Sequence, residues 1–274
     1  MKPITKIIIL LLTLFSSATL LLAQEDNSSV PIGEYRRLHS RVLNEDRIIL
    51  IHLPRGYEES QDRYPVLYCL DGDDLSLAFS SATVRILSRR KIPDMIVVAI
   101  SNTDRSRDMF PVKLRGRPTT GGADNFLSFI IDELFPFIDK NYRTENFRIL
   151  YGASAAGLFT VYALLSKPES FSGYISSSPM IGRCPEFISE KANNLFRSRK
   201  SLRKILYMTY GRGDAPPVTE FVPPFVKTIE AVKPGDFIWE LRIIEDDGHI
   251  PYTSLYDGLG FIFSDEVTLY NKRK

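Results

Sequence analysis

The stretch FRILYGASAAGLFTVYALL, residues 147–165, decides how this chain folds. A short β-rich run leads into Ser154, which is flanked by glycine and alanine, and an apolar pattern typical of a helix follows. A strand, a serine between very small residues and a helix form the layout of a nucleophile elbow. The turn is so sharp that only glycine or alanine fits two residues before and two residues after the serine. The same residues are also compatible with a serine N-cap on an ordinary strand-to-helix turn.

The rest of the chain alternates between strand-like and helix-like stretches. Two β-rich runs, at 35–43 and 47–53, are joined at Asn44-Glu45-Asp46 in a predicted hairpin. Further strands are predicted at 66–70, 95–100, 147–151, 172–176, 205–210 and 237–243, and helices at 77–89, 123–141, 157–166, 185–197, 218–232 and 251–263. This alternation predicts a mostly parallel sheet with helices on both faces. Because no repeat or linker interrupts it, we expect residues 34–274 to form a single α/β domain.

The amino terminus has the features of a secretory signal peptide. Lys2 and Lys6 precede an almost unbroken apolar run over residues 7–22, and cleavage after Ala18 or Ala23 would suit a signal peptidase. An uncleaved membrane anchor is the alternative, because the run approaches spanning length. We expect residues 1–23 to be a signal peptide and residues 24–33 a polar lead-in. The protein is then exported, to the periplasm or outside the cell, without a stable membrane anchor after cleavage.

Charge and cysteine content exclude several other classes of function. The 274 residues carry 35 Lys and Arg against 33 Asp and Glu, a formal net charge of +2. Such a balance argues against nucleic acid as a partner, because little basic excess is available to neutralise phosphates. Cys69 and Cys184 could pair in an exported protein, although Cys69 lies in a predicted buried strand where a free thiol acts as a small hydrophobe. No Cys/His spacing indicates a metal site, and no cofactor is expected.

A nucleophilic serine needs a base, and the chain offers three histidines. His39 and His52 fall inside the amino-terminal strands and are interpreted as ordinary strand residues. His249 follows the last predicted strand and precedes the last helix. In the α/β-hydrolase layout the order along the chain is serine, acid, histidine, so His249 occupies the expected place of the base.

The acid that orients the histidine should follow the preceding strand, which ends near residue 210. Asp214 lies there, in the glycine-rich turn Gly211-Arg212-Gly213-Asp214. Glu220 is the alternative, although it falls in the next predicted helix. Asp246 and Asp247 are close in sequence to His249 and are interpreted as residues of a solvated loop.

Two backbone N–H groups are needed to stabilise an oxyanion. One is the N–H of Ala155, the residue after the serine, and the other comes from a loop after an early strand. The tripeptide Asp71-Gly72-Asp73 occupies that loop, which makes the N–H of Asp73 the predicted second donor.

A basic loop after the strand at 95–100 is the candidate for substrate recognition. Its arginines include Arg105, Arg107 and Arg115. Arginine binds anionic groups in a bidentate manner, so these side chains could hold an anionic ligand. The alternative is a solvated loop in which Arg105 or Arg107 pairs with Asp108.

Taken together, these residues resemble the esterase D-type "putative esterase" family of α/β hydrolases, and most closely its siderophore (trilactone) esterase-like branch. The matching motifs run from about residue 47 to 263: Leu53-Pro-Arg-Gly-Tyr57, Tyr64-Pro-Val-Leu-Tyr68, Leu70-Asp-Gly-Asp73, Asn102-Thr-Asp-Arg105, Gly121-Gly-Ala123, Glu133-Leu-Phe-Pro-Phe137, Tyr142-Arg-Thr144, the elbow, Ser178-Pro179, His249 and Leu255-Tyr-Asp-Gly-Leu259. The resemblance implies an α/β-hydrolase fold with little or no lid, Ser154 as nucleophile and His249 as base. The family usually reads Gly-His-Ser-x-Gly-Gly at the elbow, and this chain departs from it at Ala153 and Ala156.

The function that these expectations favour is an exported serine esterase acting on a small-molecule ester through an acyl-enzyme. The resemblance suggests siderophore-like catecholate esters as substrates, with feruloyl or acetyl carbohydrate esters as the alternative. A protein of another class, which keeps the pocket but binds a ligand without turnover, is the second alternative, motivated by Ala153 and Ala156.

Overall fold

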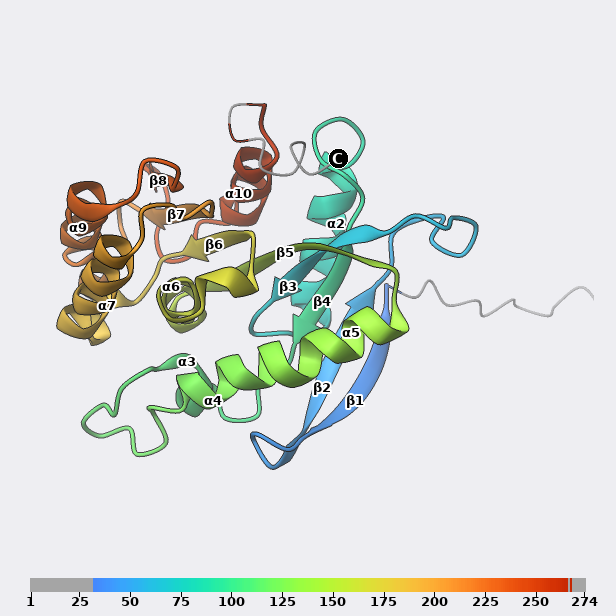
Figure 1. Ribbon diagram of the computed structural model, residues 1–274, viewed down its shortest axis with the longest axis horizontal. Coiled ribbons are helices and arrows are strands. Elements are labelled where there is room, and N and C mark those ends of the chain that lie inside the picture. The colour runs from blue at the N-terminus through green and yellow to red at the C-terminus, as the bar shows by residue number, and fades with distance from the viewer. Residues whose placement is uncertain (1–31, 266, 268–274) are drawn as a thin grey trace, which may run out of the picture. The chain divides into compact units, whose positions relative to one another are not determined.

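The centre of the fold is an eight-stranded sheet with the strand order β1-β2-β4-β3-β5-β6-β7-β8 (Figure 1). The computed structural model describes residues 32–265 and 267, so the predicted signal peptide lies outside the described residues. All strands from β4 to β8 in this order run parallel, and β2 pairs antiparallel with both β1 and β4. The strands are β1 Glu34–Ser40, β2 Glu45–His52, β3 Tyr64–Cys69, β4 Ile96–Ile100, β5 Thr144–Ala153, β6 Gly173–Ser177, β7 Ile205–Gly211 and β8 Ile238–Ile244.

Helices cover both faces of this sheet, as the alternating pattern predicts. Figure 1 shows α2 and α10 on one side and α4 to α7 with α9 on the other. The α-helices are α2 Asp74–Leu87, α3 Arg105–Met109, α4 Ala123–Ser128, α5 Phe135–Asn141, α6 Ala155–Ser166, α7 Pro185–Ser198, α8 Pro216–Thr219, α9 Val222–Val232 and α10 Ser254–Ile262. A π-helical segment, Phe129–Leu134, and short 3₁₀ turns at Pro168–Ser170 and Ile181–Arg183 complete the set. The predicted fold class is therefore confirmed.

Two hydrophobic cores hold these layers together, one on each face of the sheet. Strand β4 reads Ile-Val-Val-Ala-Ile and all five of its residues are buried, because a strand with helices on both sides contacts apolar side chains on both faces. On one face α2 and α10 pack through Leu77 and Leu255. On the other face α6 contributes a helix in which every residue from Ala155 to Leu165 is buried. Within the described residues, no helix is long and apolar enough to cross a membrane.

Three predicted elements differ from the observed ones at a proline or a turn. The hairpin turn comes earlier than predicted, because Asn44 takes the left-handed conformation and Glu45 already pairs in β2. The predicted helix 123–141 contains a π-helical segment just before Pro136, a residue that cannot donate the normal helical hydrogen bond. The predicted helix 218–232 is divided into α8 and α9, and Pro223 and Pro224 occupy the first turn of α9.

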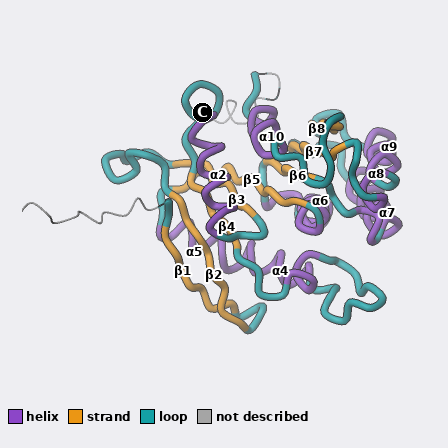
Figure 2. The backbone as a smooth tube through the Cα atoms, turned by 180° about the vertical axis from the view of Figure 1, so that it is seen from behind, coloured by secondary structure: helices purple, strands orange, loops and turns teal. Residues whose placement is uncertain are grey.

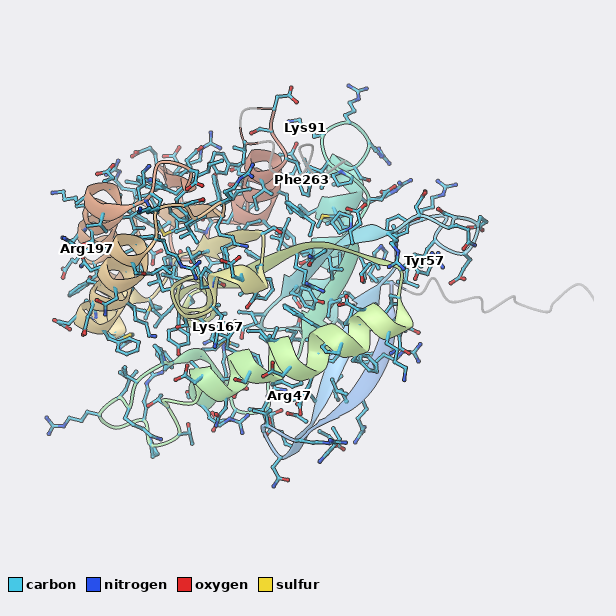
Figure 3. The ribbon with its side chains drawn as sticks, in the orientation of Figure 1. Arg47, Tyr57, Lys91, Lys167, Arg197 and Phe263 are labelled. Atoms are coloured by element: carbon cyan, nitrogen blue, oxygen red, sulfur yellow. The ribbon has the colours of Figure 1, made fainter. Side chains whose placement is uncertain are left out.

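A buried charge network joins the β1–β2 end of the sheet to α3. Arg47 is fully buried and its guanidinium contacts Glu45 Oε1 at 2.8 Å and Asp108 Oδ2 at 2.7 Å. Its guanidinium carbon lies 5.0 Å from the centre of the Phe126 ring, which belongs to α4. Figure 3 labels Arg47. Arg107 completes the network by contacting both oxygens of Glu45. Hydrogen bonds from Arg107 and then Arg47 lower the pKa of Glu45 to about 2.

We predict that replacing Glu45 with glutamine destabilises the fold in a pH-dependent way. The variant leaves Arg47 buried beside one carboxylate fewer, which should cost about 2–3 kcal/mol in free energy of unfolding at neutral pH. Because the pKa of Glu45 is lowered on folding from 4.5 to about 2, its contribution is present above pH 4.5 and is lost as the pH falls toward 2. Urea unfolding across this pH range should show the difference between wild type and variant shrinking with acidification.

The matched control is Glu169→Gln. Glu169 pairs with Arg199 and Lys204, but its side chain is 69 % exposed, so the change should be within about 0.5 kcal/mol. Equal destabilisation by the two substitutions would contradict the importance of the buried network.

Candidate active site

Ser154 lies at the sharp turn between β5 and α6. Its φ of 59° and ψ of −118° place it in a region that residues other than glycine rarely adopt. The N–H of Ser154 donates to the carbonyl of Ser177 at 2.9 Å, and its carbonyl accepts from Met180 N–H at 3.3 Å. These bonds fix the strained turn against the end of β6.

Small residues around Ser154 permit this turn. A Cβ on Gly152 would collide with the carbonyl of Ala156 and would lie 2.6 Å from Thr160 Oγ1. A Cβ on Gly157 would lie 2.6 Å from the carbonyl of Ser177, so Gly157 allows α6 to approach β6 closely. Ala156 itself is fully buried within this arrangement. The departure at Ala156 is thus accommodated, with glycines required at 152 and 157.

The carboxyl ends of β5 to β8 meet at one edge of the sheet, because these strands are parallel and in register. Ser154 follows β5, Asp214 follows β7 and His249 follows β8. His249 Nε2 lies 2.9 Å from Ser154 Oγ, and His249 Nδ1 lies 2.6 Å from Asp214 Oδ1. The structure therefore brings together the three side chains that the sequence analysis singled out.

Asp214 is held by a tight turn directly after β7. Its N–H donates to the carbonyl of Gly211 at 3.0 Å, and its Oδ1 also accepts the N–H of Ala215 at 2.7 Å. A side chain on Gly211 would collide with the carbonyls of Asp247 and Gly248. This glycine therefore lets the turn that carries Asp214 pack against the histidine loop, the segment 245–253 between β8 and α10. The Asp214 carboxylate is fully buried, whereas the imidazole of His249 is 39 % exposed. A buried carboxylate bonded to Nδ1 fixes the orientation of the ring, so that Nε2 faces the Ser154 hydroxyl.

Glu220, the alternative acid, is exposed at the end of α8. Among the contacts of the described residues, the carboxylate bonded to His249 belongs to Asp214. His39 and His52 lie in β1 and β2, as expected of strand residues, and His39 contacts Asp46.

A set of hydroxyl groups supports the histidine loop, and the sequence analysis did not assign them this role. The N–H of Ile250 donates to Ser178 Oγ at 2.9 Å. Ser254, at the start of α10, donates to the carbonyl of Pro251 at 2.6 Å and contacts the hydroxyls of Thr209 at 2.6 Å and Ser177 at 2.9 Å. The sequence does show serines and threonines near the ends of buried strands, which could have drawn attention to them. Only the folded sheet shows which loop these hydroxyl groups contact.

The two predicted oxyanion donors occupy different situations. Ala155 is the first residue of α6. The first hydrogen bond of this helix runs from the N–H of Leu158 to the carbonyl of Ser154, so it does not use the N–H of Ala155. The N–H of Asp73 already donates to Ser76 Oγ at 2.8 Å, while the Asp73 carboxylate accepts the N–H of Ser76 at 2.7 Å. Asp73 is thus the N-cap of α2 in a capping box. An oxyanion that used the N–H of Asp73 would have to replace the Ser76 hydroxyl as acceptor.

The three arginines of the basic loop have separate surroundings. Arg105 contacts both oxygens of Asp71, at 2.7 and 2.8 Å, with its guanidinium partly exposed. Arg107 directs its three guanidinium nitrogens at Glu45 and Asp108, so it belongs to the buried charge network rather than to a ligand site. Arg115 is exposed in the loop between α3 and α4, which extends beyond α4 in Figure 2. The three arginines therefore do not form one anion-binding group. Arg105 is the member whose ion-pair partner, Asp71, lines the same cavity as Ala153, the residue before Ser154.

Neither cysteine forms a disulfide. Cys69 and Cys184 are both free and buried. Burial raises the pKa of each thiol to about 12, so both remain protonated at neutral pH.

The parallel sheet, the strand–serine–helix turn and the helices on both faces define an α/β hydrolase. A family model described as "Putative esterase" matches residues 40–211. The chain belongs to this esterase family.

Individual relatives agree with the family assignment. The ferri-bacillibactin esterase BesA of Bacillus subtilis is 29% identical over 208 residues, which are 68% of this chain and 71% of that protein. An endo-1,4-beta-xylanase/feruloyl esterase of Xylanibacter ruminicola is 29% identical over 215 residues, which are 73% of this chain but only 26% of that protein. The crystal structure of an IroE-like serine hydrolase from Shewanella oneidensis aligns with a TM-score of 0.76 at 28% identity and covers 84% of this chain and 80% of the other.

The elbow geometry predicts an unequal response to alanine at two glycines. Gly152→Ala introduces a Cβ against the backbone of Ala156, so it should lower the free energy of unfolding by about 1–3 kcal/mol. Gly235→Ala is the control, because a Cβ there meets nothing within 4 Å, and it should change that free energy by less than about 0.5 kcal/mol. Urea denaturation of both variants measures the difference, and equal effects would show that the elbow is not sterically constrained.

Proposed function

We propose that this protein is a serine esterase that hydrolyses carboxylic esters through an acyl-enzyme. The observation that carries the proposal is the continuous chain of contacts from Asp214 through His249 to Ser154. A serine bonded to an imidazole that is itself oriented by a buried carboxylate has the arrangement needed for nucleophilic attack. An intact chain of this kind also argues against the binding-protein alternative.

The proposed reaction has two stages. His249 Nε2 takes the proton of Ser154 Oγ as that oxygen attacks the ester carbonyl, and the resulting tetrahedral intermediate carries an oxyanion. Collapse of the intermediate breaks the bond to the alcohol, which receives the proton from His249. A water molecule then attacks the acyl-serine while His249 Nε2 takes a proton from it. His249 passes this proton to Ser154 Oγ as the acyl–Oγ bond breaks, which releases the carboxylic acid and restores the serine hydroxyl.

The N–H groups of Ala155 and Asp73 are the proposed oxyanion donors. A donor of this type is typically worth about 3 kcal/mol of barrier. Because Ser76 Oγ accepts the Asp73 N–H in the structure, the proposal requires the Ser76 side chain to rotate or shift as the oxyanion forms. The Asp73 carboxylate stays with the N–H of Ser76 at the start of α2, where helix-end N–H groups offset its charge.

Siderophore-like esters are the proposed natural substrates. Support comes from the relative described as a ferri-bacillibactin esterase. Arg105, whose side chain is partly exposed, is the proposed contact for an anionic part of such a ligand, which would have to share this guanidinium with Asp71. Feruloyl or acetyl carbohydrate esters are the second candidate, favoured by the relative that is described as a xylanase/feruloyl esterase.

Loss of the proposed nucleophile or base should remove hydrolysis. Ser154→Ala should abolish turnover of p-nitrophenyl acetate without unfolding the protein, and a fluorophosphonate probe should label wild type at Ser154 but not the variant. His249→Ala should lose most activity, and the double variant should be little worse than either single one, because the two groups act as a unit. Esterase activity retained by purified Ser154→Ala would overturn the proposal.

Asp214 and Glu220 provide a matched pair of acids for the same assay. Asp214→Asn keeps the shape of the side chain but no longer stabilises the imidazolium, so kcat should fall by roughly 10²- to 10⁴-fold. Glu220→Gln, at an exposed position, should leave kcat within about twofold. The reverse outcome would assign the acid to Glu220.

Export is proposed from the sequence of residues 1–23 alone. Amino-terminal sequencing of the protein from its own cell should begin near Thr19 or Gln24. Recovery of the chain from the cytosol with Met1 intact would contradict export without affecting the proposed chemistry.

A further inference from the structure

A cavity of about 530 Å³ opens beside the residues that flank Ser154 and His249. Ala153 borders it on one side and Ile250 on another, each one residue from a member of the proposed catalytic group. Asp73, the proposed second oxyanion donor, borders it as well. A group placed in this cavity would therefore lie next to an ester bond held at Ser154.

The wall of the cavity is mainly apolar. Most of its large side chains come from α2, from β5 and from the loop that follows His249, and these are Leu75, Phe79, Tyr151, Ile250, Pro251 and Tyr252. Four of them belong to the small set of large hydrophobic residues that the described chain exposes: Leu75 and Tyr252 are each 77% exposed, and Phe79 and Ile250 are each 39% exposed. Apolar side chains gathered at an open cavity, rather than scattered singly, mark a surface that binds an apolar group.

The polar groups that the structure describes in the wall offer no positive charge to a ligand. Asp71 is neutralised by the two contacts with Arg105 and accepts a further hydrogen bond from Asn102. The Asp73 carboxylate accepts the N–H of Ser76 at the start of α2 and remains negative, so it disfavours an anionic group in the cavity. Burial raises the pKa of Tyr151 and of Cys69, so both remain protonated and neutral. Among the described residues that line the cavity, none is a lysine, arginine or histidine.

We propose that this cavity is a specificity pocket for an uncharged apolar or aromatic group attached directly to the scissile ester. This inference rests on the proposed esterase function and adds to it the class of substituent accepted next to the ester bond. An anionic part of the substrate would lie outside this pocket, toward the face where Arg105 is exposed. The shared chemistry is an apolar substituent, which either the acyl group or the alcohol could supply.

Two substrate series distinguish those sources. One varies the acyl group in p-nitrophenyl acetate, hexanoate and benzoate, and the other varies the alcohol in methyl, hexyl and benzyl acetate. In one of the series kcat/KM should rise by roughly tenfold or more from the smallest to the largest member, because more apolar surface is buried in the complex. p-Nitrophenyl hemisuccinate should be a poorer substrate than the butyrate, because its carboxylate would meet an apolar wall.

Variants test whether this cavity is responsible. Leu75→Ala and Tyr252→Ala, both at strongly exposed positions, should lower the ratio of kcat/KM for the preferred large ester to that for the smallest ester by roughly three- to tenfold. Ile86→Ala is the matched control: Ile86 is 59% exposed on the same helix as Leu75 but does not border the cavity, so the ratio should stay within twofold.

The outcomes separate this inference from the proposed function. If hydrolysis depends on Ser154 but neither series shows a size preference, the pocket assignment is wrong and the esterase proposal stands. A preference for the hemisuccinate, or equal effects of Leu75→Ala and Ile86→Ala on the ratio, would also overturn the pocket. If Ser154→Ala retains hydrolysis of every ester, the proposed function itself fails.

Discussion

The strained turn at Ser154 is the constraint on which the rest of the site depends. A serine with positive φ needs glycine at 152, because the chain returns past that residue one helical turn later. The turn is stabilised because the backbone N–H of Ser154 donates to the carbonyl of Ser177 at the end of β6. This bond fixes the serine relative to the sheet. A side chain at this position has few ways to move, which suits a nucleophile that must meet one imidazole.

The parallel sheet then determines what surrounds the serine. Loops after β3, β5, β6, β7 and β8 all leave from the same edge, so residues far apart in sequence are brought to one place. Hydroxyl groups at the strand ends do more than fill space: Ser178 holds the backbone at Ile250, and Ser254 links the histidine loop to β6 and β7. Because these hydroxyls are buried and satisfied, they limit the conformations that the loop carrying His249 can adopt.

Charge is divided between structural and surface roles in a way that composition does not reveal. Arg47 and Arg107 are drawn into a buried cluster with Glu45 and Asp108, whereas Arg105 stays at the surface beside Asp71. Of the three arginines of the basic loop that the sequence analysis singled out, only Arg107 helps to hold α3 against β2. The cavity beside Ser154 is instead lined by apolar side chains from α2 and from the loop after β8.

The sequence by itself determined the layered α/β architecture, the place of every strand and the candidacy of Ser154, His249 and Asp214. Each of these is encoded locally, by apolar periodicity or by a small-residue turn, and by the order of residues along a known topology. It misjudged the ends and continuity of elements where a proline or Asn44 altered the backbone, because those effects depend on a few dihedral angles. Tertiary structure alone decided that Asp214 rather than Glu220 contacts His249, that Arg107 is used in a buried ion pair, and that an apolar cavity adjoins the serine. These are contacts between residues distant in the chain, and their existence depends on how the loops pack at the sheet edge, which no local pattern records.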